Sequence, residues 1–177
     1  MRTRLIILGA TLLVVLAAGS AGATGFFTDD NDSIHLRSIE AIADDGITKG
    51  CNPPVNDMFC PKDVVTREQM ATFLVRALDL PAAVGSFVDT AGSVHEADIG
   101  ALAAAGITKG CNPPVNDMFC PRDVVTREQM ATFLVRAMDL TAGVASFVDP
   151  AGSVHEADLG ELAAAGITKG CNPPVND

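Results

Sequence analysis

The feature that most constrains this chain is an internal repeat of 60 residues. Residues 51–80 and 111–140 are nearly identical, and a third copy begins at Phe147. The first two copies differ only at Lys62/Arg122 and Leu78/Met138. A repeat of this length is a supersecondary unit that buries its apolar face against its neighbours. The pattern therefore predicts a modular array, and such arrays usually bind other molecules rather than catalyse reactions.

The N-terminus has the three parts of a secretory signal peptide. Arg2 and Arg4 form a basic start, residues 5–19 are mostly apolar, and residues 21–23 (Ala-Gly-Ala) form a small-residue cleavage site. The apolar run is shorter than the roughly 20 residues that a spanning helix needs, so a retained N-terminal anchor is the second interpretation. We expect residues 1–23 to be removed, leaving an exported protein with no membrane span.

The remaining chain divides by its period into three repeats: 24–84, 85–144 and a truncated third repeat, 145–177. The third copy reaches the Cys-Asn-Pro-Pro-Val-Asn-Asp segment without the Met-Phe-Cys-Pro that follows it in the first two copies. We expect a fragment of a longer protein. The alternative is a homo-oligomer in which another chain completes the third repeat, with Cys171 in an intermolecular bridge.

Each repeat is typical of a helix, a loop and a second helix. In the second repeat, Ser93 with Glu96 forms a capping-box pattern, and Gly106 is placed to end the first helix. Thr126 with Gln129 forms the capping box of the second helix. Helices of about a dozen residues are unstable alone in water. The prediction is an all-α fold, a compact bundle of short helices from successive repeats.

The composition and motifs argue against a nucleic-acid partner and against catalysis. The formal net charge is −10, whereas nucleic acids require a basic footprint. The sequence shows no Ser/His/Asp or Cys/His nucleophile set and no phosphate-binding glycine loop. We therefore expect no enzyme activity, no cofactor and no nucleic-acid partner.

The cysteines indicate one local disulfide in each complete repeat. Cys51 would pair with Cys60 and Cys111 with Cys120, because an exported chain favours disulfides. Closing so small a loop stabilises the fold by roughly 2–3 kcal/mol. A zinc site shared by two loops is the alternative, although the spacing is unlike that of zinc knuckles.

Two other patterns have metal-binding alternatives. His35, His95 and His155 recur once per repeat and could meet at a metal site, but packing or local capping is the preferred interpretation. The acidic run at residues 29–32 resembles a calcium loop without its glycine and distal glutamate. We interpret that run as a solvated turn.

The order of elements resembles the S-layer homology (SLH) module. In the second repeat the elements are Phe-Val-Asp at 87–89, the helix start at 95–99, Gly-Ile-Thr-Lys-Gly at 106–110, Phe-Cys-Pro at 119–121, and the Thr-Arg-led helix at 126–137. The resemblance covers nearly all of residues 27–177. The cysteine-bridged loop resembles a variant found in secreted actinobacterial proteins.

This resemblance implies a cell-envelope attachment module located at the cell surface. In the family, three modules form a pseudo-threefold unit whose grooves bind secondary cell-wall polysaccharide with acidic, often pyruvylated sugars. The implied ligand residues are the arginine that begins the second helix and the glycines of the Gly-Ile-x-x-Gly turn, with the lysine of that turn as a further candidate. In this sequence they are Arg67, Arg127, Lys49, Lys109, Gly46, Gly50, Gly106, Gly110, Gly166 and Gly170.

Four alternatives accompany these assignments. Arg67 and Arg127 could instead form ion pairs within a module, with Asp63 or Asp123 as partners. Lys49, Lys109 and Lys169 could be solvated turn residues. For function, the alternatives to glycan binding are a self-assembling surface-layer module and the anchor of a larger exported enzyme.

Overall fold

The computed structural model describes residues 25–85, 87–141, 143, 147–149 and 151–172. This part of the chain contains helices and no strand, which confirms the predicted all-α class. The predicted signal peptide lies outside the described residues. The helices are α1 (Leu36–Asp44), α2 (Arg67–Ala77), α3 (Glu96–Ala104), α4 (Arg127–Ala137) and α5 (Glu156–Ala164).

The second helix of each complete repeat begins as its sequence predicts. Thr66 caps α2 by accepting a hydrogen bond from the Gln69 N–H, and the Gln69 side-chain oxygen accepts one from the Thr66 N–H. Thr126 and Gln129 form the same capping box in α4. Each box satisfies two of the backbone donors that a helix N-terminus leaves open.

The capping box predicted at Ser93 is wrong. The N-cap of α3 is His95, and no side chain caps it. Ser93 Oγ instead accepts from the His95 N–H at 3.1 Å, and Glu96 Oε2 accepts from the Gly92 N–H at 3.2 Å. Both side chains therefore stabilise the turn before the helix, because local serine and glutamate contacts compete with the helical start.

Glycine ends the first helix of each repeat, as predicted. Gly106 has φ +73°, and the Ile107 N–H after it bonds to the Leu102 carbonyl at 3.1 Å. This is the left-handed helix terminus that glycine adopts most readily. Gly46 and Gly166 hold the equivalent positions with φ +70° and +73°.

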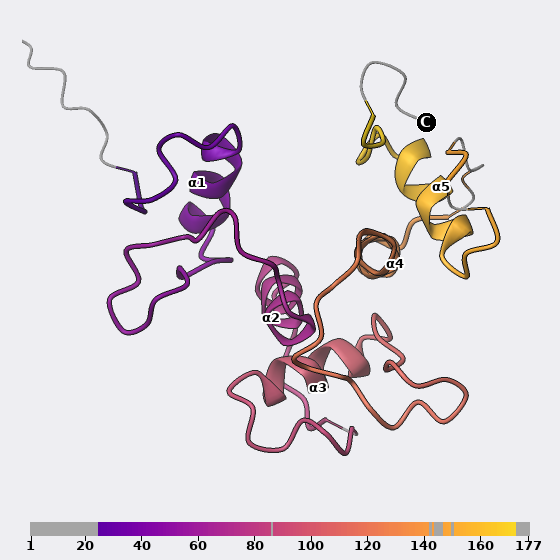
Figure 1. Ribbon diagram of the computed structural model, residues 1–177. Coiled ribbons are helices and arrows are strands. Elements are labelled where there is room, and N and C mark those ends of the chain that lie inside the picture. The colour runs from indigo at the N-terminus through magenta and orange to yellow at the C-terminus, as the bar shows by residue number, and fades with distance from the viewer. Residues whose placement is uncertain (1–24, 86, 142, 144–146, 150, 173–177) are drawn as a thin grey trace, which may run out of the picture.

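Helix packing crosses the repeat boundaries. The second helix of one repeat packs on the first helix of the next, so that α2 pairs with α3 and α4 with α5 (Figure 1). The larger core combines Met70 and Leu74 of α2 with Ile99 and Leu102 of α3, and Phe119 inserts from the cysteine loop. Ala131 and Val135 of α4 form a second cluster with Leu162 of α5. Neighbouring repeats thus supply the packing that α2, α3, α4 and α5 lack alone.

The pairs follow one another along the chain, and α1 and α5 lie well apart in Figure 1. The predicted pseudo-threefold bundle is not seen in this arrangement. It stays a prediction, and the predicted repeat boundaries stay predictions as well. No helix in the described ranges is long and apolar enough to cross a membrane.

Both predicted disulfides are present. Cys51 is bonded to Cys60 and Cys111 to Cys120, while Cys171 is free and exposed. A carboxylate holds each loop from within its own repeat: Asp89 accepts from the backbone N–H groups of Phe119 and Cys120 at 2.8 and 2.7 Å. Asp29 makes the same pair of bonds in the first repeat.

Candidate functional site

The junction between the first two repeats is built around Arg67. This residue begins α2, and its Nε donates to the Phe119 carbonyl of the next repeat at 2.8 Å. The guanidinium carbon lies 4.8 Å from the ring centre of Phe119 and 5.2 Å from that of Phe133, within cation–π range. The side chain is only 5% exposed. Arg67 therefore joins α2 to the loop and the second helix of the following repeat.

The backbone at the start of α2 is also occupied by the next repeat. The Arg67 N–H donates to the Asp123 carbonyl at 2.9 Å, and the Glu68 N–H donates to the Pro121 carbonyl at 3.0 Å. A free helix N-terminus can bind an anion, but chain carbonyls take these donors here. Burial lowers the pKa of Arg67, and the charges of Asp123 and Asp89 oppose that effect.

This placement does not favour the ligand contact predicted for Arg67. The predicted alternative was an ion pair within the module, whereas the aspartate beside Arg67 is Asp123 of the next repeat. The contact that forms with Asp123 is between backbone atoms, beside a longer-range charge attraction. The guanidinium contributes to the junction, and a ligand would have to displace Phe119 to reach it.

A groove lies over the same junction, which we name groove 1. Its volume is about 680 Å³, and it contains three carboxylates, one histidine and one cation. The Glu68 carboxylate accepts from Ser93 Oγ at 2.7 Å, which ties α2 to the turn before α3. The lining residues are Glu68, Asp89, Ala91, Gly92, Ser93, Val94, His95, Met118, Cys120, Pro121, Arg122 and Asp123.

A buried threonine positions the histidine of groove 1. The Thr72 hydroxyl of α2 donates to an Asp98 carboxylate oxygen and lies 2.7 Å from His95 Nδ1. Because the hydroxyl has one proton, His95 Nδ1 must be the donor in the second bond. Thr132, His155 and Asp158 repeat this network between α4 and α5. These contacts confirm the packing interpretation of His95 and His155.

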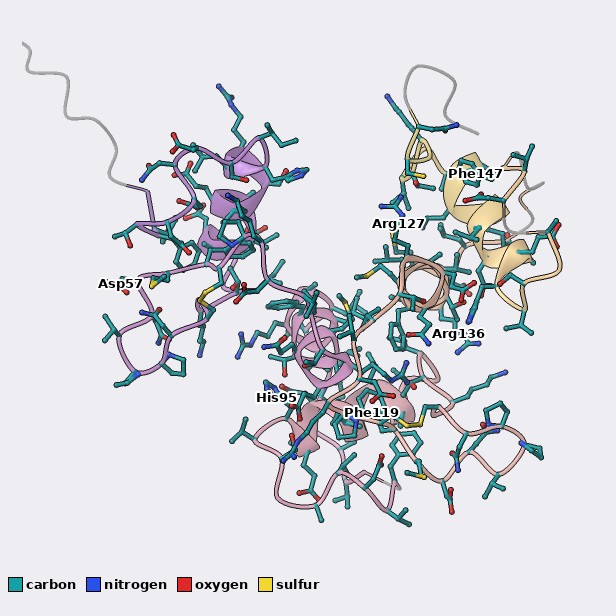
Figure 2. The ribbon with its side chains drawn as sticks, viewed as in Figure 1. Asp57, His95, Phe119, Arg127, Arg136 and Phe147 are labelled. Carbon is teal, nitrogen blue, oxygen red and sulfur yellow. A yellow bond between two sulfur atoms is a disulfide. The ribbon has the colours of Figure 1, made fainter. Side chains whose placement is uncertain are left out.

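A second cavity, groove 2, lies between α4 and the third repeat. Its volume is about 340 Å³. Arg127, at the start of α4, is exposed there, and Phe147 lies beside α5 (Figure 2). The lining residues are Thr126, Arg127, Glu128, Phe147, Asp149, Leu159, Thr168, Gly170 and Cys171. Arg67 and Arg127 thus occupy equivalent positions in sequence with opposite exposures.

The predicted glycines occupy positions where the backbone conformation or a close backbone contact disfavours a side chain. Gly46, Gly106 and Gly166 are the left-handed helix ends described above. Gly110 has φ +93°, and a Cβ there would lie 2.6 Å from the Met118 carbonyl; Gly50 meets the same obstacle at Met58. Of the six predicted glycines, only Gly170 lines a groove. Lys49, Lys109 and Lys169 are exposed on their turns and line neither groove.

Sequence reasoning missed Arg122 and Asp123 as groove residues. Arg122 was visible only as a difference between copies, although lysine at position 62 keeps the positive charge. The available signal was that this position keeps its positive charge although the residue changes from lysine to arginine. Among the described residues, no group of three or more His, Cys, Asp or Glu side chains is arranged to hold a metal ion.

The sequence is similar to surface-layer proteins of bacilli. It is 30% identical over 148 residues to the S-layer protein sap of Bacillus anthracis, and 29% identical over 148 residues to the S-layer protein of Bacillus thuringiensis subsp. finitimus. Each match covers 78% of this chain but 17% of the relative. The chain thus spans about a sixth of the length of these S-layer proteins.

A third relative has a different overall function. The chain is 39% identical over 83 residues to an endoglucanase of Bacillus sp. (strain KSM-635), a match covering 46% of this chain and 8% of the enzyme. No family model matches the sequence. The similarity is therefore to a small part of each of these relatives.

Proposed function

We propose that this chain is a non-catalytic attachment module that holds an exported protein on the cell envelope by binding cell-wall polysaccharide. The observation that carries the proposal is the similarity of this one small region to S-layer proteins and to an endoglucanase. A region shared by proteins with such different names supports an accessory role for it. Attachment at the cell surface is a function that both could use.

Groove 1 has the chemistry of a glycan site. The carboxylates of Glu68 and Asp123 can accept hydrogen bonds from sugar hydroxyls, and so can the Ser93 oxygen, whose own proton is donated to Glu68. Arg122 is exposed, and its guanidinium can bind a carboxylate in a bidentate manner. An acidic sugar, of the pyruvylated kind implied by the resemblance to SLH modules, would therefore contact Arg122, while neutral sugars contact the carboxylates. Lys109 is a second candidate for an outer contact.

Sedimentation with purified cell envelopes tests the proposal. We expect Arg122→Ala to weaken binding by about tenfold or more, because a charge-assisted hydrogen bond contributes roughly 1.5–3 kcal/mol. Arg37→Ala is the matched control, since Arg37 is an exposed cation on α1 that lines neither groove. Both variants should keep the circular dichroism spectrum of the parent. Equal sedimentation of the two variants would show that groove 1 is not the ligand site.

Self-assembly is the second candidate function, favoured by the free and exposed Cys171. If it is correct, light scattering should show a mass that rises with concentration and falls in Cys171→Ser. A constant monomer mass over a hundredfold concentration range would exclude it. The anchor of a larger exported enzyme is compatible with glycan attachment, because the chain matches only 8% of the endoglucanase.

A further inference from the structure

The side chains of groove 1 carry more negative charge than positive charge. Glu68, Asp89 and Asp123 contribute three carboxylates, and Arg122 is the one cation among the lining residues. In the part of the chain that the structure describes, none of these carboxylates forms an ion pair with a lysine or an arginine. Arg67 is attracted to two of them but is buried in the junction and does not line the groove. The groove therefore has an excess of negative charge that a ligand can neutralise.

The hydrogen-bonding groups on the α2–α3 side of groove 1 are acceptors. The Ser93 hydroxyl donates its proton to the Glu68 carboxylate at 2.7 Å, so its oxygen is left to accept. His95 lies at the start of α3 beside α2 (Figure 2), and its Nδ1 donates to the Thr72 hydroxyl oxygen. In the neutral ring the other nitrogen, Nε2, then carries a lone pair and accepts as well. This side of the groove thus fits a ligand group that donates several hydrogen bonds.

An ammonium group fits these acceptors better than a metal ion does. Among the described residues, no group of three or more His, Cys, Asp or Glu side chains is placed to hold a metal. An ammonium has three N–H donors, each of which can bond to a different acceptor. Its hydrogen bonds to a carboxylate are charge-assisted, so they are stronger than those from a neutral hydroxyl. The charge and the hydrogen-bonding pattern of the groove therefore favour the same kind of ligand group.

We propose that groove 1 binds an amino sugar whose nitrogen is not acetylated and carries a positive charge. This inference rests on the attachment function proposed above and names the class of glycan. Glu68, Ser93 and His95 adjoin one another, and they accept the hydrogen bonds of the ammonium. Arg122 stays available for an acidic substituent. The preferred wall polymer therefore has free amines beside its acidic groups, rather than acidic groups alone.

Soluble trisaccharides test the amine directly. The two probes are a trisaccharide of β-linked glucosamine and its fully N-acetylated form, which have the same length and linkage. We expect the unaltered chain to bind the amine form at least about tenfold more tightly, because acetylation removes the charge and leaves one N–H donor where there were three. Nuclear magnetic resonance titration of the backbone and histidine-ring signals measures both affinities. Because both probes meet the same protein, the comparison does not depend on the folding of a variant.

Glu68→Gln tests the carboxylate that the inference places against the ammonium. The variant should reduce the preference for the amine form to about threefold or less, because the charge-assisted acceptor is lost. A glutamine oxygen can still accept from Ser93, and circular dichroism should match that of the parent. Asp63→Asn is the control, since it removes an exposed carboxylate that lines neither groove. An undiminished preference in Glu68→Gln would contradict the assigned contact.

Cell envelopes separate this inference from the attachment function. Acetic anhydride converts free amines to amides and leaves carboxylates unchanged. We expect the chain to sediment with untreated envelopes and to bind at least about tenfold more weakly after this treatment. Equal binding to both would overturn the inference and leave the attachment function standing. If untreated envelopes did not bind, the attachment function would fail, and the trisaccharides would decide the inference alone.

Equal affinities for the two trisaccharides would overturn the inference whatever the envelopes show. If envelope binding still fell on acetylation, the amine would belong to wall peptides rather than to a sugar. A preference for the acetylated trisaccharide would overturn the inference as well, because groove 1 would then bind a neutral amide.

Discussion

The two helix-leading arginines allow one residue to be tested in two environments. Arg67 and Arg127 lie in identical helix sequences, yet Arg67 is 5% exposed and Arg127 is exposed on the surface of groove 2. Replacing each by alanine separates the contribution of the junction from that of the local helix. The difference between the two losses of stability measures what the next repeat contributes.

The structure sets the expected size of that difference. Arg67→Ala removes the bond to the Phe119 carbonyl, a charge-assisted bond contributing roughly 1.5–3 kcal/mol. It also removes two buried cation–π contacts, of up to about 2 kcal/mol in a desolvated site. We expect a loss of about 3–4 kcal/mol in the free energy of unfolding. Arg127→Ala should change it by less than about 0.5 kcal/mol, as for most surface substitutions.

Urea denaturation followed by circular dichroism at 222 nm measures both values, since the chain has no tryptophan. Arg67→Met keeps most of the apolar stem and removes the charge, so it should fall between the parent and Arg67→Ala. Equal losses for Arg67→Ala and Arg127→Ala would refute the junction argument. The effect would then come from the helix start that the two arginines share.

Three further substitutions test other parts of the fold. Asp30→Thr should stabilise the protein by roughly 1–3 kcal/mol, because neither buried Asp30 carboxylate oxygen has a partner among the described residues. The equivalent Thr90, by contrast, donates to the Phe87 carbonyl. Asp32→Thr is the exposed control, and thermal denaturation measures both variants. Gly100→Ala should destabilise the protein by roughly 1–3 kcal/mol in urea denaturation, because the new Cβ would collide with the Ala83 carbonyl. Gly85→Ala is the control and should have little effect, because its Cβ would meet its nearest atom at 3.6 Å. Thr72→Val should lower the free energy of unfolding by roughly 1–3 kcal/mol, because it leaves His95 and Asp98 without their shared hydroxyl. Thr72→Ser keeps the hydroxyl and should recover most of that stability. Equal losses for the two variants would contradict this network.

The sequence predicted the parts of the fold that local residues decide. The threonine caps of α2 and α4, the glycine helix ends and the two nine-residue disulfide spacings all depend on residues close in the chain. The Ser93 cap failed because two local arrangements use the same side chains, and the turn was preferred over the helix start.

The candidate site was less predictable because its properties depend on the next repeat. No local signal distinguishes Arg67 from Arg127, since their helices have the same sequence. What differs is whether a phenylalanine 52 residues further along the chain covers the guanidinium. Arg122 was missed for the same reason, because it reaches groove 1 from a loop whose position is fixed by contacts with α2.

The first repeat departs from the other two at the positions that receive a preceding repeat. Asp98 and Asp158, which bind the threonines of α2 and α4, are replaced by Ser38. Gly100 and Gly160, buried in α3 and α5, are replaced by Glu40. A second copy could therefore not dock its second helix on α1 as α2 docks on α3, because the carboxylate partner is missing and a larger side chain stands where Gly100 allows the linker to pass. These differences give the array a direction, and they disfavour head-to-tail self-assembly.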